Sequence, residues 1–306
     1  MLGLGALAED RRQQPLLNRV RISDRLLKWL FLLPSVLILM FLSLYPFLQG
    51  IWMSLHQWPL GGGERAFVGT ANYAALLGAE RFHGAVWNTV VFTGVSVTLE
   101  LVLGTALALY LFSLSERWRP IFRTIFIVPM VVTPIATGLM WRLMLNGRIG
   151  VVNYLLYLVG ITPPEWTSSP MLAMATIIMI DVWQWTPLVI MIVFAGLLSI
   201  PDTLYEAARV DGAPRWAVFR HITLPGIKYM LAIAVVFRLM RSFRSFDIIW
   251  LVTQGGPGTA TEILNVYLYR TAFVFLDGGI AAAMGLILLV ITIATTMGLL
   301  RAVGVQ

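Results

Sequence analysis

Residues 171–198 read MLAMATIIMIDVWQWTPLVIMIVFAGLL, and Asp181 is the only charged residue among them. A helix needs about 20 mostly apolar residues to cross the hydrocarbon core of a bilayer. Because this stretch is longer than that and carries a single charge, it predicts a membrane-spanning helix. That prediction fixes the class of the whole chain, since the rest of the sequence has the same character.

The composition of the chain excludes an ordinary soluble protein. Of its 306 residues, 58% are hydrophobic and 12% charged, and the mean hydropathy is +0.82. Soluble domains are about 45–50% apolar and about 25% charged. The formal net charge of +7 indicates a cytoplasmic membrane face in so apolar a chain, rather than a nucleic-acid partner.

Six stretches are long and apolar enough to span a membrane. They cover residues 29–48, 85–113, 124–141, 171–198, 230–252 and 278–300. We therefore predict an all-α membrane protein with six transmembrane helices. Residues 1–28 are expected to form a cytoplasmic N-terminal tail, and residues 29–306 a single membrane domain.

The distribution of basic residues predicts the orientation of the chain. Fourteen Lys and Arg residues lie before the first span, in the second and fourth inter-span segments, or after the last span; five lie in the other segments. Cytoplasmic loops carry the excess of Lys and Arg. Both termini are therefore expected in the cytoplasm, with the segments around Asn72 and Gly256 outside.

The fourth inter-span segment, residues 199–226, is predicted to form a cytoplasmic helix pair. Asp202 or Thr203 can cap a first helix, and Gly212 can end it in a left-handed conformation. Pro214 suits the first turn of a second helix, which Leu224-Pro225 is expected to stop. The pattern favours a docking element for either the lipid surface or a partner protein.

The same segment carries a specific motif. Residues 206–213 read EAARVDGA, followed at a fixed distance by Ile222, Leu224 and Pro225. This pattern closely resembles the EAA loop of permease subunits in binding-protein-dependent ABC importers. Further resemblance to the maltose-type "first" permease of carbohydrate importers lies in Phe67-Val68-Gly69, Asn72-Tyr73, Asn88-Thr89, Phe92-Thr93, Trp183-Gln184, Pro187, Phe243-Arg244, Phe246-Asp247 and Thr253-Gln254-Gly255-Gly256-Pro257.

This resemblance implies a type I ABC importer permease fold in a bacterial or archaeal inner membrane. It also implies that the loop sits in a groove of a separate ATPase. The implied coupling residues are Glu206, Ala207, Ala208, Asp211, Gly212 and Ala213. The implied partners are a second homologous permease, two ATPase copies, an extracytoplasmic solute-binding protein and membrane lipid, with no nucleic acid.

The chain lacks the residues that an ATPase or metalloenzyme would need. A phosphate-binding loop requires G-x-x-x-x-G-K-[ST], and neither Lys28 nor Lys228 lies in such a sequence. There is no cysteine, and the three histidines are isolated. We expect no catalytic residue, metal site or cofactor in this chain; ATP and Mg²⁺ would be used by the partner ATPase.

Six ionisable residues fall inside the predicted spans: Glu100, Asp181, Arg238, Arg241, Arg244 and Asp247. Such groups are costly in a membrane, so they face the protein interior and tend to pair. They can form a neutralising network that fixes helix packing, with Arg244 and Asp247 able to pair directly. They can also form the wall of a polar cavity.

Aromatic and polar residues in the fourth and fifth spans suggest a path for a sugar. Sugar rings stack on aromatic side chains, and their hydroxyls need polar partners. The predicted substrate pathway contains Trp183, Gln184, Arg238 and Phe243. The expected function is ATP-driven import of a sugar or sugar-like solute; the alternatives are an anionic cargo, such as a glycerol phosphate derivative or an acidic sugar, and a secondary transporter driven by an ion gradient.

Overall fold

The computed structural model describes residues 24–303, and the chain divides after Gly50 into two compact units. Most of the predicted N-terminal tail lies outside the described residues, and Asp24 already begins the first helix. The helices of the described chain are α1 (Asp24–Ser54), α2 (Ala71–Leu77), α3 (Glu80–Ser113), α4 (Arg119–Val131), α5 (Pro134–Met144), α6 (Val151–Leu158), α7 (Pro170–Leu198), α8 (Asp202–Val210), α9 (Arg215–Val218), η1 (Phe219–Thr223), α10 (Leu224–Ser242), α11 (Asp247–Val252), α12 (Leu264–Phe273) and α13 (Gly278–Val303). A small antiparallel pair of strands joins β1 (His56–Gln57) to β2 (Ala66–Phe67).

The described residues confirm the all-α prediction. Five helices are long and apolar enough to cross a membrane, and a bent helix pair brings the number up to six if it counts as one span. The first is α1, whose apolar stretch runs from Lys28 to Ser54 and contains Pro34 and Pro46.

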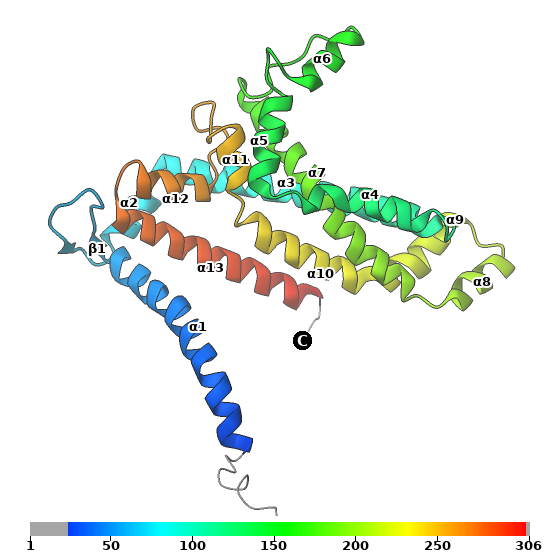
Figure 1. Cartoon of the computed structure of the whole chain (residues 1–306), viewed down its shortest axis with the longest axis horizontal. Coiled ribbons are helices and arrows are strands. Elements are labelled where there is room, and N and C mark those ends of the chain that lie inside the picture. Colours follow the sequence, from blue (N-terminus) through cyan, green and yellow to red (C-terminus); the bar gives the residue numbers. More distant parts are fainter. Residues whose placement is uncertain (1–23, 304–306) are drawn as a thin grey trace, which may run out of the picture. The chain divides into compact units, whose positions relative to one another are not determined.

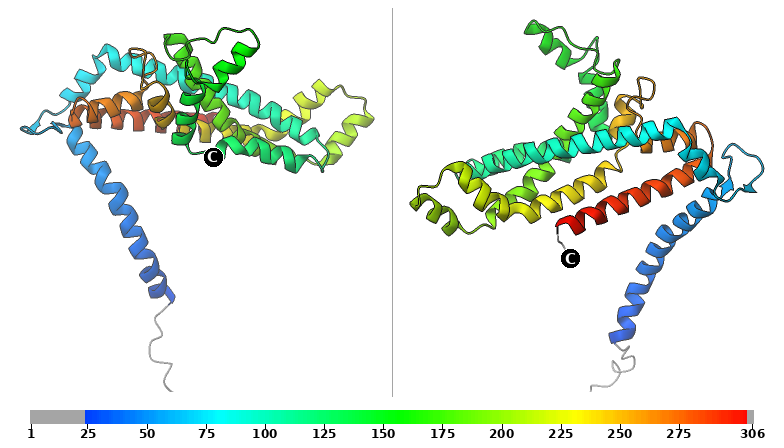
Figure 2. Two further views of the ribbon diagram at one scale, coloured as in Figure 1. Left: turned by 45° about the horizontal axis from the view of Figure 1, so that its top comes forward. Right: turned by 180° about the vertical axis from the view of Figure 1, so that it is seen from behind.

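In the second unit, α7 is the central helix. It packs against α3, α4 and α10, while α10 also packs against α3 and α13; these helices are seen side by side in Figures 1 and 2. Close approach of α3 to α7 depends on Gly104, because a Cβ there would lie 2.7 Å from Cβ of Val189. Small residues at helix contacts allow this kind of packing in membranes.

The predicted third span is not one continuous helix. Its two parts, α4 and α5, meet at an angle of 92°. Val132 and Thr133 are extended, the conformation favoured immediately before a proline, here Pro134. The side chain of Gln184 donates a hydrogen bond from Nε2 to the carbonyl of Val132 at 2.9 Å, which satisfies a backbone group freed by the break.

The predicted fifth span also differs from the structure. The helix ends at Ser242, and residues 243–246 lead to the short helix α11. Asn265 Nδ2 donates hydrogen bonds to the carbonyls of Phe243 (2.7 Å) and Ser245 (3.0 Å). This side chain therefore satisfies backbone groups that the helix no longer pairs.

Leu224-Pro225 does not stop the second cytoplasmic helix, contrary to the sequence prediction. The chain runs from α9 through the π-helical turn η1 directly into α10, and residues 215–242 form one apolar candidate span. Pro225 lies in the first turn of α10, next to the π turn, where the usual helical hydrogen-bond pattern is already altered. The second helix of the predicted cytoplasmic pair and the predicted fifth span are thus continuous.

Side chains also order the segments predicted to be external. Asn72 Nδ2 donates to the carbonyls of Ser54 (2.8 Å) and His56 (2.9 Å). Glu262 is buried and accepts two hydrogen bonds from Arg81, at 2.7 and 2.8 Å, and one from Arg270 at 3.2 Å. These contacts connect α2, α3 and α12 to the intervening loops.

Candidate functional site

A buried cluster of three charged residues connects α3, α7 and α10. Arg238 is 0% exposed. Its Nε donates to Oε2 of Glu100, and its Nη2 donates to Oε1 of Glu100 at 2.6 Å and to Oδ2 of Asp181 at 2.8 Å. The planar guanidinium group suits such multiple contacts with carboxylates.

This cluster has a structural role that the sequence left open. Charged groups within a membrane are tolerated when they pair with one another inside the protein. Arg238 contacts carboxylates on two other helices, so its full set of contacts forms only when all three helices are in place. Of the two roles considered from the sequence, Glu100, Asp181 and Arg238 therefore form the neutralising network that fixes helix packing.

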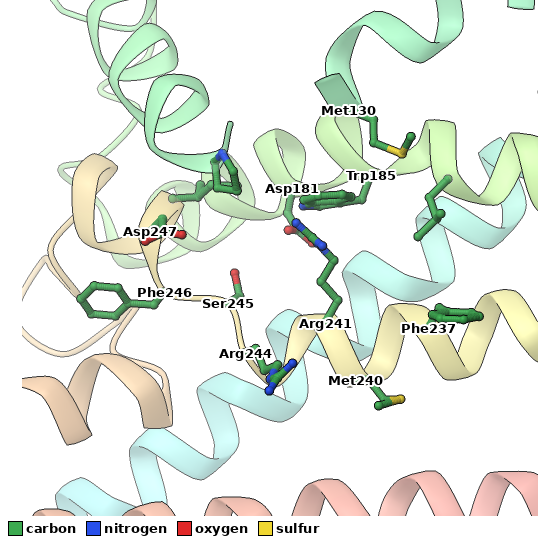
Figure 3. Close-up of a pocket in the computed structure, with 13 residues that line it drawn as sticks. Met130, Asp181, Trp185, Phe237, Met240, Arg241, Arg244, Ser245, Phe246 and Asp247 are labelled. Atoms are coloured by element: carbon green, nitrogen blue, oxygen red, sulfur yellow. The ribbon is translucent and has the colours of Figure 1, made fainter. Parts of the chain in front are cut away.

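Beside the cluster lies a cavity of about 830 Å³. Its wall comes from the ends of α4 and α5, from α7, from α10 and from the segment that leads into α11 (Figure 3). The residues that line it are Met130, Pro134, Asp181, Trp185, Leu188, Phe237, Met240, Arg241, Arg244, Ser245, Phe246, Asp247 and Ile248. Asp181 and Trp185 lie near the middle of α7, so the cavity is near the depth at which transporters bind their substrates.

Arg241 and Trp185 form the most specific contact on this wall. The guanidinium carbon of Arg241 lies 3.3 Å from the centroid of the Trp185 ring, well inside the range of a cation–π interaction. Figure 3 shows the Arg241 side chain reaching from α10 toward Trp185 and Asp181. The contact places the positive charge of Arg241 at the cavity wall. Among residues 28–301, no carboxylate forms a salt bridge with this arginine.

None of the four predicted pathway residues lines this cavity. Arg238 is buried in the charged cluster, and Phe243 is buried. Gln184 bonds to the break between α4 and α5. Trp183 lines a separate, mostly apolar groove with residues of α3 and α4.

Helix geometry explains these positions. Residues two apart on a helix point in different directions, whereas residues three or four apart share a face. Trp185 therefore shares a face with Asp181, four residues earlier, and Trp183 does not. Arg241 follows Arg238 by three residues in the same way, a spacing that could have identified the cavity residues from the sequence.

Arg244 and Asp247, the other expected ion pair, both line the cavity. No salt bridge joins them within the described part of the chain. Helix α10 ends at Ser242, before Arg244, and α11 begins at Asp247, so the two residues do not share one helix and the expected i, i+3 spacing does not apply.

The predicted coupling loop, residues 199–226, presents a mixed charged and apolar surface. The exposed residues include Glu206, Ala207, Asp211 and Gly212, together with Val210 at 88% and Trp216 at 68% exposure. Gly212 has a φ of +66°, which confirms the left-handed turn expected there, and its N–H donates to the carbonyl of Arg209 at 3.2 Å. Neither Asp202 nor Thr203 caps α8 with its side chain, because the N-cap position is Pro201.

The opposite face of α8 packs on the chain itself. Ala208 is buried, Ala213 is half-buried, and the Tyr205 hydroxyl lies 3.3 Å from Oγ1 of Thr223. Of the predicted coupling residues, Ala208 thus faces inward, while the others reach the surface fully or in part. Within residues 24–303, no group of three or more His, Asp or Glu side chains is arranged to hold a metal ion.

Comparison with known proteins identifies the family. Residues 100–302 match the family described as "Binding-protein-dependent transport system inner membrane component". The trehalose/maltose transport system permease protein MalF of Thermococcus litoralis is 34% identical over 94% of this chain and 96% of that protein. The sulfoquinovosyl glycerol transport system permease protein SmoG of Agrobacterium fabrum is 33% identical over 95% of this chain and 95% of that protein.

Solved structures agree with this result. A chain of a bacterial ABC transporter involved in the import of the acidic polysaccharide alginate has a TM-score of 0.79 and 25% identity, covering 90% of this chain and 94% of that one. A bacterial alginate ABC transporter in complex with an alginate pentasaccharide-bound periplasmic protein gives a TM-score of 0.78 at 25% identity, over 90% and 93% of the two chains. The matches confirm the resemblance drawn from the EAA motif and the type I importer permease fold. The chain belongs to the family of binding-protein-dependent transport system inner membrane components, and it is a permease subunit of an ABC importer.

Proposed function

We propose that this permease moves a sugar or sugar-like solute inward and is driven by a separate ATPase that binds residues 199–226. The observation that carries the proposal is the continuity of α9, η1 and α10. A force applied to the exposed loop reaches the charged cluster through one helix, because Arg238 lies on α10 and bonds to α3 and α7.

The exposed residues of the loop provide the surface for the ATPase. Glu206 and Asp211 offer negative charge, and Val210 and Trp216 offer apolar area. Exposed apolar side chains with polar residues around them are typical of protein contacts. Ala207 and the left-handed turn at Gly212 allow a close approach, whereas Ala208 and Ala213 support the loop from within.

The remaining partners follow from the single loop. One loop engages one ATPase, so a second homologous permease and a second ATPase copy complete the transporter. ATP and Mg²⁺ bind in the ATPases, and an extracytoplasmic binding protein delivers the solute to the side that carries Asn72 and Gly256. Both termini then lie in the cytoplasm of the host cell, in its inner membrane.

The names of the relatives support a carbohydrate cargo, since they include permeases for trehalose/maltose and for sulfoquinovosyl glycerol. The cavity beside Trp185 is the proposed binding region, in place of the four residues expected from the sequence. Gln184 and Arg238 support the wall of this cavity from behind. Trp183 lies on the other side of α7, and Phe243 is buried directly after the end of α10. The family match disfavours the alternative of an ion-gradient-driven carrier.

Uptake into proteoliposomes tests the proposal. The permease is reconstituted with its partner subunits, and uptake is measured with and without lumenal ATP and the binding protein. We expect uptake to need both, Glu206→Lys to abolish it, and Glu206→Asp, which keeps the negative charge, to retain it. Uptake driven by an ion gradient alone, or unaffected by Glu206→Lys, would contradict the proposal.

A further inference from the structure

The two arginines on the cavity wall form no salt bridge with a carboxylate among the described side chains. Asp181 is 2% exposed and accepts its hydrogen bond from Arg238. Arg241 and Arg244 are both exposed at the cavity. Asp247 lies in the first turn of α11, where the N-terminal end of a helix stabilises a negative charge.

Bonding, rather than net charge, distinguishes the arginines from one another. The six ionisable residues in the predicted spans carry three positive and three negative charges, which sum to zero. Arg238 donates from Nε and Nη2 to Glu100 and Asp181, whereas the guanidinium of Arg241 lies over the ring of Trp185 and donates no hydrogen bond within the described chain. A guanidinium that makes a cation–π contact and no hydrogen bond keeps its N–H groups available, and these form paired donors in the geometry that binds a carboxylate.

The cavity also has the surface that a sugar ring needs. Phe237, which is 57% exposed, lines it together with Met240 and Phe246. Its volume of about 830 Å³ lies within the range of about 300–1,000 Å³ typical of sites for small ligands. Apolar faces beside free donors suit a ring that carries an acidic group.

We propose that this cavity binds the acidic group of an anionic sugar derivative, with Arg241 as the principal donor and Trp185 holding it in place. This inference rests on the proposed function and narrows its cargo. Arg244 adds a second positive group to the cavity wall, and Phe237 contacts the ring. Arg238, although the most buried arginine, takes no part in binding.

Two sugars that differ in one group provide the test. The complete importer is placed in lipid nanodiscs without ATP or binding protein, and binding of glucuronate and of glucose is followed by tryptophan fluorescence and thermal stability. We expect glucuronate to bind at least about tenfold more tightly than glucose, because its carboxylate accepts charge-assisted hydrogen bonds from Arg241 that glucose cannot replace. Arg241→Gln should remove this preference, and Arg241→Lys should reduce it by losing the paired donors.

Arg148→Gln is the matched control, since it removes the same charge at an exposed residue outside the cavity, and it should bind glucuronate normally. Equal affinity for the two sugars, no binding of glucuronate, or a preference that survives Arg241→Gln would overturn the proposal. The proposal would also be overturned if the Arg241→Gln variant no longer assembled with the second permease subunit. That result would mean that Arg241 pairs with that subunit and not with a sugar. The proposed function is tested separately, by ATP-dependent uptake and its loss in Glu206→Lys. A negative result in the sugar-binding experiment would leave that uptake result unchanged.

Discussion

Arg238 and Glu100 lie 138 positions apart in the sequence and form a buried ion pair between α10 and α3, with Nη2 of the arginine 2.6 Å from Oε1 of the glutamate. Asp181 on α7 completes the cluster. One arginine therefore holds two carboxylates, and this imbalance makes the three residues unequal in their contribution to stability.

We expect Arg238→Gln to be more damaging than Glu100→Gln. The first leaves two buried carboxylates without a cation, a kind of change that costs about 3–5 kcal/mol in buried ion pairs. The second leaves Arg238 paired with Asp181 and should cost less. Thermal unfolding of the reconstituted importer measures both variants.

A triple variant, Arg238→Gln with Glu100→Gln and Asp181→Asn, is expected to recover much of the stability that Arg238→Gln loses. It carries no buried charge at the cluster. Glu116→Gln is the control, because it removes the same kind of charge at an exposed residue and should leave stability unchanged. Equal stability of Arg238→Gln and Glu100→Gln would mean that the charge imbalance is met by groups outside the cluster.

Gly212→Pro should uncouple ATP hydrolysis from transport. Proline fixes φ near −65°, whereas Gly212 has a φ of +66° and donates its N–H to Arg209. Gly212→Ala keeps the N–H and strains the turn by about 1–2 kcal/mol, so it should transport at a reduced rate. ATPase activity and uptake are measured together; normal coupling in Gly212→Pro would remove the turn from the mechanism.

Gly104→Ala should destabilise the contact between α3 and α7. The added Cβ would lie 2.7 Å from Cβ and Cγ1 of Val189, and overpacking of this kind costs about 1–3 kcal/mol. Val189→Ala should restore stability in the double variant. Gly94→Ala, on the same helix with no atom within 4 Å of the new Cβ, should have no such cost; equal melting temperatures for Gly94→Ala and Gly104→Ala would contradict the close approach.

The orientation can be tested because the chain has no natural cysteine. Single cysteines replace Glu64 and Asp211, both exposed. A membrane-impermeant maleimide added outside intact cells should label position 64 and leave position 211 unlabelled until the membrane is opened. Labelling of position 211 from outside would reverse the predicted topology.

The number and class of the spans could be predicted from hydropathy, since bilayer thickness sets their length. Where each helix ends could not. The break at Val132 and Thr133 depends on Pro134 and on a hydrogen bond from Gln184, 52 positions away. After α10 ends at Ser242, the side chain of Asn265 donates hydrogen bonds to the backbone carbonyls that follow. Contacts between residues so far apart in the sequence leave no periodic signal in it.

The charged residues were identified from the sequence, but their partners were not. A neutral sum of six charges is compatible with many pairings, and only the packing of α3 against α7 and α10 selects Glu100 and Asp181 for Arg238. The coupling loop was easier to find because its motif is local. Its turn at Gly212 follows from glycine alone, whereas the continuation through Pro225 depends on the π turn before it.

The order of the charged cluster along the chain has a consequence for biosynthesis. Glu100 and Asp181 leave the ribosome before Arg238 does, so α3 and α7 enter the membrane before their shared cation exists. Until α10 arrives, these helices hold carboxylates that have no counter-ion from this cluster and depend on water or the insertion machinery for solvation. Synthesis of α10 supplies that counter-ion, and only then can the three helices pack around their shared ion pairs.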